Sequence, residues 1–356
     1  MNTLFKPVFD LFNYIKMFQR YLGFKMYLVF VFNIVASLLE GFGILMLLPL
    51  FESLGASDNV ANDNRFNIYI YEIIDYLGWS TSTVSVLKLI VLIFILKGFI
   101  TMIALGINSY LIGDLLKGIK MNLFGHYTDM SFSYYSSKNT GDFINIVAEQ
   151  PNIAIESFKQ LIHFGSHLIN TFVLIFIAFS ISSSFGGLAI AAGVILLILF
   201  LRLNSYVQGL SRITAFENSN LNKWLVQVLQ GFKYLISTNQ IKKLKTYIFD
   251  SINLLTVNHV KSGISASFTQ SVREPLAVVL IVSIIYFQLV IFEQRLEPIL
   301  VSIALFYRAL SSTLAVQSSF QGTFQFIGSM EMINDEFRNQ KLNKVKNGFK
   351  KINNFK

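Results

Sequence analysis

Apolar residues in this chain gather in six long runs, which are separated by polar segments of very unequal length. A helix needs about 20 residues to cross the hydrocarbon layer of a bilayer, and each run is that long or nearly so. The pattern therefore predicts an all-α integral membrane fold with six transmembrane helices, within a domain spanning residues 24–322. The runs cover residues 24–51, 84–113, 161–181, 185–201, 275–292 and 299–320.

The polar segments between the runs suggest how the helices are connected. Residues 182–184 and 293–298 are short enough for tight hairpins, and residues 52–83 predict a loop of medium length. The segments 114–160 and 202–274 are long, and their helical pattern continues without a cluster of Gly and Pro. We therefore expect long cytoplasmic extensions of the membrane helices in these two places.

The first long polar segment contains the sequence FSYYSSKNTGDFINIVAEQPN at residues 132–152. Thr140 is suited to cap a helix, and Asp142 lies in the first turn, where the helix dipole favours an anion. Pro151 is expected to end that helix, which predicts a short helix near residues 140–149. Phe143 and Ile144 would give it an apolar face. This short helix is either a docking site for a partner protein or a solvated turn between two longer helices.

The second long polar segment predicts a short amphipathic helix near residues 218–230. Asn218 and Asn220 are good capping residues, and apolar side chains follow at helical spacing. Such a helix must pack on a neighbouring helix or on a separate protein. The apolar positions begin with Leu221, Trp224 and Leu225 and continue through Val228, Leu229 and Phe232.

The two ends of the chain are amphipathic or charged. Within residues 1–23, apolar Val8, Leu11 and Phe18 share one helical face, which predicts an elbow helix lying in the membrane interface. The alternative is that this segment simply begins a core helix. Residues 323–356 are charged and rich in Asn and Lys, which predicts a helix end followed by a cytoplasmic linker.

Composition and charge agree with a membrane protein. The chain of 356 residues is 53% hydrophobic and only 14% charged, whereas soluble domains average about 25% charged residues. The net charge of +9 comes from 29 Lys and Arg residues, most of which lie in the two tails and the two long polar segments. By the positive-inside rule these parts are cytoplasmic, so the basic excess reflects topology and predicts no nucleic-acid partner. We expect a multi-pass protein of the plasma membrane (bacterial inner membrane) in contact with membrane lipids.

Motifs for catalysis or cofactor binding are largely missing from the sequence. There is no cysteine, and neither a GxxxxGK[ST] phosphate loop nor an HExxH pair occurs. His163 and His167 are spaced i, i+4 and could hold a metal from one helical face, but no carboxylate or third histidine lies nearby in the sequence. A polar pair that lines a pore or an interface is the preferred interpretation. We predict no catalytic, cofactor or metal site within this chain.

Three charged residues interrupt the apolar runs and are the better candidates for function. Glu40 lies in the first run, Lys97 in the second and Arg308 in the sixth. A charge inside the bilayer is costly and should face a bundle interior or a watery cavity. These residues either line a substrate path, with Arg308 suited to a phosphate, or form an internal ion pair that orients the helices.

Taken together, these features resemble the transmembrane half of an ABC exporter of the lipid-flippase and multidrug type (type IV). The resemblance rests on the six-helix plan with its elbow helix and two long cytoplasmic extensions. It rests also on Tyr134-Tyr135 followed by Thr140-Gly141-Asp142-Phe143-Ile144-Asn145, and on the stretch from Leu225 to Gly231 with Lys233 and Ile236. In the first run, Glu40-Gly41-Phe42-Gly43 and Leu48-Pro49-Leu50 resemble the branch that flips lipid-linked oligosaccharides.

The resemblance implies that the two short helices are coupling helices, which transmit movement from ATPase domains. Thr140, Gly141, Asp142, Phe143 and Ile144 would contact one ATPase domain, and Leu221, Trp224 and Leu225 the other. The working unit would be a dimer with a second copy or a homologous half-transporter, in which helices four and five reach across to the partner. ATP and Mg²⁺ would bind to a nucleotide-binding domain, toward which the linker at 323–356 would lead. Without that domain, no ATPase activity is expected.

Several functions therefore stay open from the sequence. The leading interpretation is the permease part of an ATP-driven exporter that moves a bulky amphipathic substrate, such as a lipid-linked oligosaccharide, outward by alternating access. An exporter of peptides or drugs is the alternative within that class. A carrier or channel that needs no ATPase, and a truncated remnant without function, are the alternatives of other classes.

Overall fold

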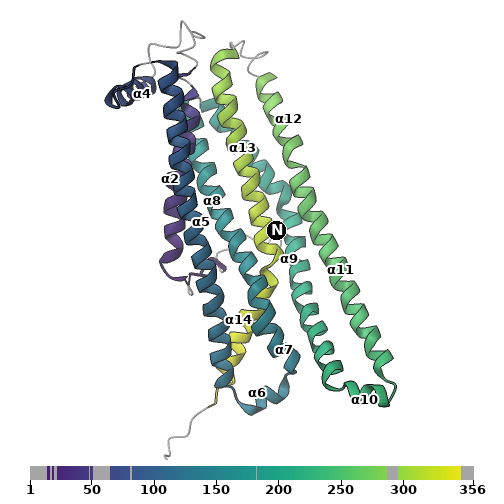
Figure 1. Ribbon diagram of the computed structural model, residues 1–356. Coiled ribbons are helices and arrows are strands. Elements are labelled where there is room, and N and C mark those ends of the chain that lie inside the picture. The colour runs from purple at the N-terminus through teal and green to yellow at the C-terminus, as the bar shows by residue number, and fades with distance from the viewer. Residues whose placement is uncertain are drawn as a thin grey trace, which may run out of the picture.

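The computed structural model is a bundle of long helices, shown in Figure 1. It describes residues 14–16, 18–19, 22–47, 49–50, 65–80, 82–181, 183–286 and 296–345, and the prediction of an all-α fold is confirmed for them. The helices are α2 (Lys25–Leu45), α4 (Arg65–Tyr76), α5 (Thr83–Thr128), α6 (Phe132–Ser137), α7 (Thr140–Ile144), the π-helical turn η1 (Asn145–Glu149), α8 (Gln150–Ile181), α9 (Ser183–Gln230), α10 (Phe232–Ser237), α11 (Ile241–Ser271), α12 (Arg273–Tyr286), α13 (Leu296–Gln325) and α14 (Ile327–Leu342).

The longest helices reach far beyond the thickness of a bilayer. Helix α5 has 46 residues and α9 has 48, which at 1.5 Å per residue gives each a length of about 70 Å. The hydrocarbon layer is only about 30 Å thick. Each helix therefore continues well past its apolar part, toward the end of the bundle where α6, α7 and α10 lie (Figure 1). We call this end the cap end.

Within the described residues, three helical segments are long and apolar enough to cross a membrane. They are Lys25–Leu45, Thr83–Thr128 and Thr140–Ile177, which contain most of the first three predicted apolar runs. The other predicted runs fall on α9, α12 and α13, although residues 287–292 of the fifth lie outside the described part.

The loop predicted at residues 52–83 is wrong in part, because it contains helix α4. Ile70 and Ile74 are one turn apart on α4 and are buried against Met46, Val86 and Leu89. This i, i+4 pair makes a narrow apolar face, which the acidic residues around it obscured in the sequence. Residues 51–64 lie outside the described part.

The main hydrophobic core lies between α5, α8, α13 and α14. Fully buried side chains from these helices include Leu123, Phe158, Phe324 and Met330. Phe18 of the N-terminal segment joins this core and packs on Phe158, with ring centroids 5.0 Å apart. The described part of residues 1–23 thus lies against protein, and its first 13 residues lie outside the described part.

The expectation that a linker begins at residue 323 is wrong. Helix α14 belongs to the bundle, since Ile327, Met330 and Ile333 are all fully buried. They recur every three residues and so share one face of the helical segment. The charged residues between them made the segment look like a tail in the sequence, and residues 346–356 lie outside the described part.

The predicted break before residues 218–230 does not occur either. Helix α9 runs without interruption to Gln230, and the short helix at the tip is α10. Asn220 does not cap a helix, because its side-chain amide donates to Glu217 in the preceding turn. The candidate residues Leu221, Trp224 and Leu225 therefore lie on the last turns of α9.

Pro151 does not end the first short helix, which also corrects the prediction. Helix α7 passes through η1 directly into α8, and the Gln150 N–H donates to the Asn145 carbonyl five residues earlier. The proline ring would clash with the carbonyl four residues before it in a regular α-helix. The wider π-helical turn accommodates Pro151 without a break.

Gly328 allows α14 to lie directly on α9. A Cβ atom at this position would approach the Ser211 carbonyl oxygen to 2.5 Å. We predict that Gly328→Ala destabilises the protein by about 1–3 kcal/mol, the usual cost of overpacking, measured as a lower midpoint of thermal unfolding in detergent.

Gly106→Ala is the matched control, because nothing lies within 4 Å of a Cβ at that helical position. Alanine favours a helix over glycine by about 1 kcal/mol, so this variant should be as stable as the parent chain or slightly more. Equal unfolding midpoints for the two variants would contradict the close packing of α14 on α9.

Candidate functional site

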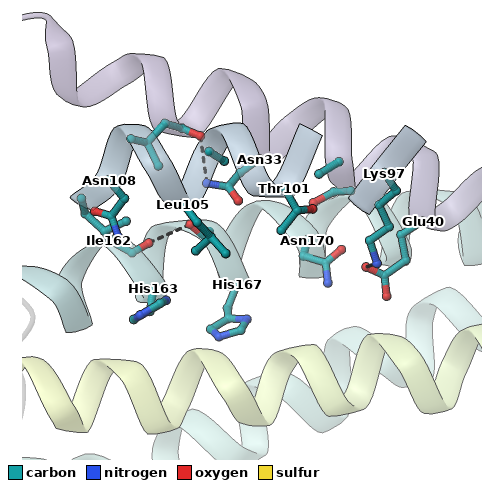
Figure 2. Close-up of a pocket in the computed structure, with 15 residues that line it drawn as sticks. Asn33, Glu40, Lys97, Thr101, Leu105, Asn108, Ile162, His163, His167 and Asn170 are labelled. Carbon is teal, nitrogen blue, oxygen red and sulfur yellow. Dashed lines mark hydrogen bonds and ion pairs between the residues drawn. The ribbon is translucent and has the colours of Figure 1, made fainter. Parts of the chain in front are cut away.

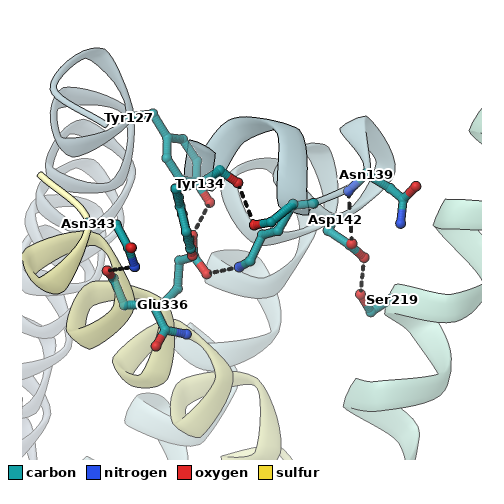
Figure 3. Close-up of polar contacts among 10 residues, drawn as sticks. Tyr127, Tyr134, Asn139, Asp142, Ser219, Glu336 and Asn343 are labelled. Atoms are coloured by element: carbon teal, nitrogen blue, oxygen red, sulfur yellow. Dashed lines mark hydrogen bonds and ion pairs between the residues drawn. The ribbon is translucent and has the colours of Figure 1, made fainter. Parts of the chain in front are cut away.

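Helix α7 is attached to α9 by polar contacts from its first turn. Asn139, rather than Thr140, is the N-cap residue, and its backbone N–H donates to Asp142 Oδ2 at 3.4 Å. The other carboxylate oxygen of Asp142 accepts a hydrogen bond of 2.9 Å from the Ser219 hydroxyl of α9 (Figure 3). Asp142 therefore caps its own helix and joins it to α9 at the same time.

Gly141 lets the backbones of α7 and α9 touch. A Cβ atom here would lie 2.8 Å from the Lys223 Cα and 2.9 Å from the Asn222 carbonyl oxygen. The Asn222 side-chain amide donates to Asn145 Oδ1 at 3.1 Å and to Glu149 Oε2 at 2.8 Å. The two segments predicted as separate coupling helices thus pack against each other within one chain.

Phe143 points toward three tyrosines of the same chain. Its ring lies 4.9 Å from Tyr127, 6.5 Å from Tyr134 and 5.9 Å from Tyr135, measured between centroids. Such aromatic contacts stabilise packing, so Phe143 anchors α7 on α5 and α6. Ile144 differs, because 49% of its surface is exposed.

The candidate residues on α9 also divide into packed and exposed ones. The Trp224 ring stacks on Tyr247 of α11, with centroids 5.3 Å apart. Leu221 is half-buried, whereas Leu225 is exposed. Of all eight predicted coupling residues, Thr140, Ile144 and Leu225 are the exposed ones.

A buried carboxylate connects α14 to this region. Glu336, whose side chain is 2% exposed, accepts hydrogen bonds from the hydroxyls of Tyr127 at 3.0 Å and Tyr134 at 2.9 Å. It also pairs with the Lys138 ammonium (Figure 3). We call these four residues the Glu336 cluster, and it joins α5, α6 and the turn before α7 to α14.

Electrostatics in this cluster favours the charged form of Lys138. Burial opposes the positive charge, but the hydrogen bond and negative charge of Glu336, with a contribution from Tyr134, outweigh it and raise the pKa of Lys138. A lysine whose pKa is raised by folding contributes stability below its ordinary pKa of about 10.4 and loses it as the pH rises through the higher folded value. Lys138 therefore carries its positive charge at neutral pH.

The chain after α14 is attached to the same region through its backbone. The Ser131 N–H donates to the Asn343 carbonyl, and the Val345 N–H donates to the Asp129 carbonyl, both at 2.9 Å. The Lys344 ammonium lies 2.8 Å from Asp129 Oδ2 and lowers the pKa of that carboxyl. Residues 343–345 are thus held beside the turn that joins α5 to α6.

Glu40, Lys97 and Arg308 come together from α2, α5 and α13. The Lys97 ammonium lies 2.8 Å from one oxygen of Glu40, and the Arg308 guanidinium donates to the other oxygen. The structure therefore contains the internal ion pair that the sequence left open as an alternative. The Glu40 side chain is 7% exposed, but that of Arg308 is 50% exposed, so Arg308 retains accessible donors.

A cavity of about 250 Å³, lined by both polar and apolar side chains, extends from this ion pair between α2, α5 and α8 (Figure 2). His163 and His167 line it, and their rings lie 6.4 Å apart. No group of three or more His, Cys, Asp or Glu side chains that could hold a metal ion occurs in the described ranges. The cavity therefore offers hydrogen bonds, rather than an evident metal site, to a ligand.

Sequence reasoning missed the residues that hold the α7 region in place. Glu336 gave only a weak signal, because a single glutamate in a charged segment resembles a solvated one. Ser219 lies within the segment Asn218–Asn220 that was predicted to cap a helix, and Asn222 was assigned no role, although both side chains bond to the α7 region. The spacing of Glu336 three residues after buried Ile333 was the one available indication that this glutamate faces inward.

Comparison with known proteins adds no relationship, since no family model matches the chain and no curated protein matches it significantly.

We predict that Glu336→Gln loosens α14. The amide still accepts from the tyrosine hydroxyls, but Lys138 loses its charged partner, which should cost about 1–3 kcal/mol. Hydrogen exchange of the backbone amides in Ile327–Leu342 should become faster at pH 7.

Asp335→Asn is the control, because Asp335 is exposed on the same helix and its replacement should leave exchange unchanged. Identical exchange in the Glu336→Gln variant and the parent chain would show that the Glu336 cluster does not hold α14.

Proposed function

We propose that this chain is the permease subunit of an ATP-driven exporter of the ABC type, which moves an amphipathic substrate across a membrane by alternating access. In this account the cap end lies in the cytoplasm and receives the ATPase domain. In this proposal all six predicted apolar runs cross the membrane. Three of them belong to the candidate membrane spans described above, and the other three lie on α9, α12 and α13.

One observation carries the proposal, namely the position of α7. This short helix lies at the tip between α5 and α8, both of which contain candidate membrane spans, and it is attached to α9 as well. Ile144 and Thr140 are exposed on it. A force applied to α7 from outside would therefore act on three long helices at once.

The internal contacts explain how such a force would be transmitted. Gly141 and Asp142 connect α7 to α9, and Phe143 connects it to α5 and α6. These side chains are occupied within the chain, so of the eight predicted coupling residues Ile144 and Leu225 are the exposed apolar ones that would contact an ATPase domain. This assignment narrows the larger set of coupling residues expected from the sequence.

ATP and Mg²⁺ would bind to a nucleotide-binding domain outside these 356 residues, since they contain no phosphate-loop motif. A second copy or a homologous half-transporter would complete the membrane unit. An ATPase-independent carrier is less well supported, because such proteins build their sites from interrupted helices, whereas α5 is continuous over its described length.

The test is photo-crosslinking in living cells from benzoylphenylalanine placed at position 144. The expected adduct, identified by mass spectrometry, is a nucleotide hydrolase, and ATP-hydrolysing activity should copurify with the chain. Adducts that never include such an enzyme would contradict the proposal.

Two controls make this test specific. Benzoylphenylalanine at position 176, which is 74% exposed on the apolar part of α8, should not capture the hydrolase. Ile144→Glu should abolish copurification because it places a charge in an apolar contact, whereas Ile144→Leu should preserve it.

A further inference from the structure

The cavity between α2, α5 and α8 is lined by one face of each helix. Its polar residues recur at helical spacing in segments that are otherwise apolar. Polar side chains in membrane segments normally face a protein interior or a wet cavity, and here three such faces converge (Figure 2). The polar residues at these positions are Asn33, Ser37 and Glu40 on α2, Thr101 and Asn108 on α5, and His163, Ser166 and Asn170 on α8.

Two asparagines of this cavity have an unused hydrogen-bond acceptor. Among the described residues, the Oδ1 atoms of Asn108 and Asn170 are buried without a partner. Asn108 is only 7% exposed, and it lines the cavity. A buried amide oxygen without a partner is costly, so these oxygens favour a ligand that donates hydrogen bonds.

The charges around the cavity restrict the class of donor. The lining residue Lys97 is paired with Glu40, and Arg308 is not among the residues that line the cavity. The unpaired carbonyl oxygens face the ligand directly and repel an anion, so a phosphate group is disfavoured. A cation is disfavoured as well, because Glu40 is already paired with both Lys97 and Arg308. An uncharged group with several hydroxyls satisfies both conditions, since each hydroxyl can donate to an asparagine oxygen and accept from another side chain.

The size of the cavity agrees with a small polar group. Its volume of about 250 Å³ far exceeds the roughly 30 Å³ of one water molecule. It is close to the lower limit of about 300 Å³ for small-molecule pockets. The cavity therefore suits one or two sugar rings or a similar polyol, and not a large oligosaccharide.

We propose that this cavity binds an uncharged, hydroxyl-rich group, such as the sugar headgroup of a glycolipid, through Asn108 and Asn170. The proposal rests on the proposed transport function for its role, because the bound group would belong to the transported amphiphile. The site lies within one chain, between three of its own helices.

Equilibrium binding to the full chain tests this assignment without ATP. The chain is purified in an amine-oxide detergent, because maltoside and glucoside detergents would themselves compete, and is transferred to nanodiscs. Binding is measured by native mass spectrometry with four probes: monoglucosyl diacylglycerol, diacylglycerol, phosphatidic acid with the same acyl chains, and free maltose.

Glucolipid should bind more tightly than diacylglycerol or phosphatidic acid. Asn108→Leu and Asn170→Leu should each weaken its binding about tenfold, as expected when hydrogen bonds to a buried amide are lost. Asn122→Leu, at an exposed position of α5 outside the cavity, should leave binding unchanged. If free maltose binds with the same dependence on Asn108, the source of the group is a free sugar; if only glucolipid binds, it is a lipid.

Tighter binding of phosphatidic acid than of glucolipid would overturn the assignment, as would equal glucolipid binding by the Asn108→Leu variant and the parent chain. Asn108→Ser, which stays polar, serves as a second variant if Asn108→Leu does not fold, and should bind with intermediate affinity. Capture of an ATPase at position 144 without glucolipid binding would overturn this assignment alone. Glucolipid binding without such capture would instead count against the proposed function.

Discussion

The contact between α7 and α9 at Gly141 is the constraint on which the cap end depends. The two backbones approach so closely that any side chain at this position would meet the Lys223 Cα. This contact places α7, which lies between α5 and α8 in the chain, against the last turns of α9. The Asp142–Ser219 hydrogen bond and the two bonds from Asn222 then set the rotation of α7 about its own axis.

The Glu336 cluster supports the same tip from the side of α14. A buried carboxylate is stable only when it is paired and hydrogen-bonded, and Glu336 has two tyrosine hydroxyls and one ammonium. Because these donors come from α5, α6 and the turn that follows, α14 cannot move away without exposing or unpairing the charge. The α7 region is therefore held by α9 on one side and by the Glu336 cluster of α14 on the other, and both sets of contacts depend on short distances between specific atoms.

Much of the fold could be predicted from the sequence, because the responsible signals are local. Apolar runs predicted the helices, and the charged residues inside these runs left an ion pair of Glu40 with Lys97 or Arg308 as one of two alternatives. Helix ends were harder, since Asn218–Asn220 could have capped a helix but α9 continues past them. Pro151 would likewise end an ordinary α-helix, but the π-helical turn before it lets the helix continue into α8. The sequence gives no sign of that turn.

The candidate site was less predictable, because its residues act through partners distant in sequence. Gly141 and Phe143 were identified, but as contacts for another protein, whereas the structure packs both against the same chain. Glu336 lies 202 residues from Tyr134, and no local pattern connects them. The orphaned oxygen of Asn108 is also a property of the assembled cavity, not of its neighbours in sequence.

The most direct measurement of the central claim is a disulfide between α7 and α9 within one chain. The chain has no cysteine of its own, so Asp142→Cys with Ser219→Cys introduces a single pair at two positions whose side chains are hydrogen-bonded, Ser219 Oγ lying 2.9 Å from Asp142 Oδ1. Mild oxidation should form the bond in nearly all molecules, with the mass of one chain retained on a denaturing gel. A bond that never forms, or that forms only between two chains, would contradict the α7–α9 contact.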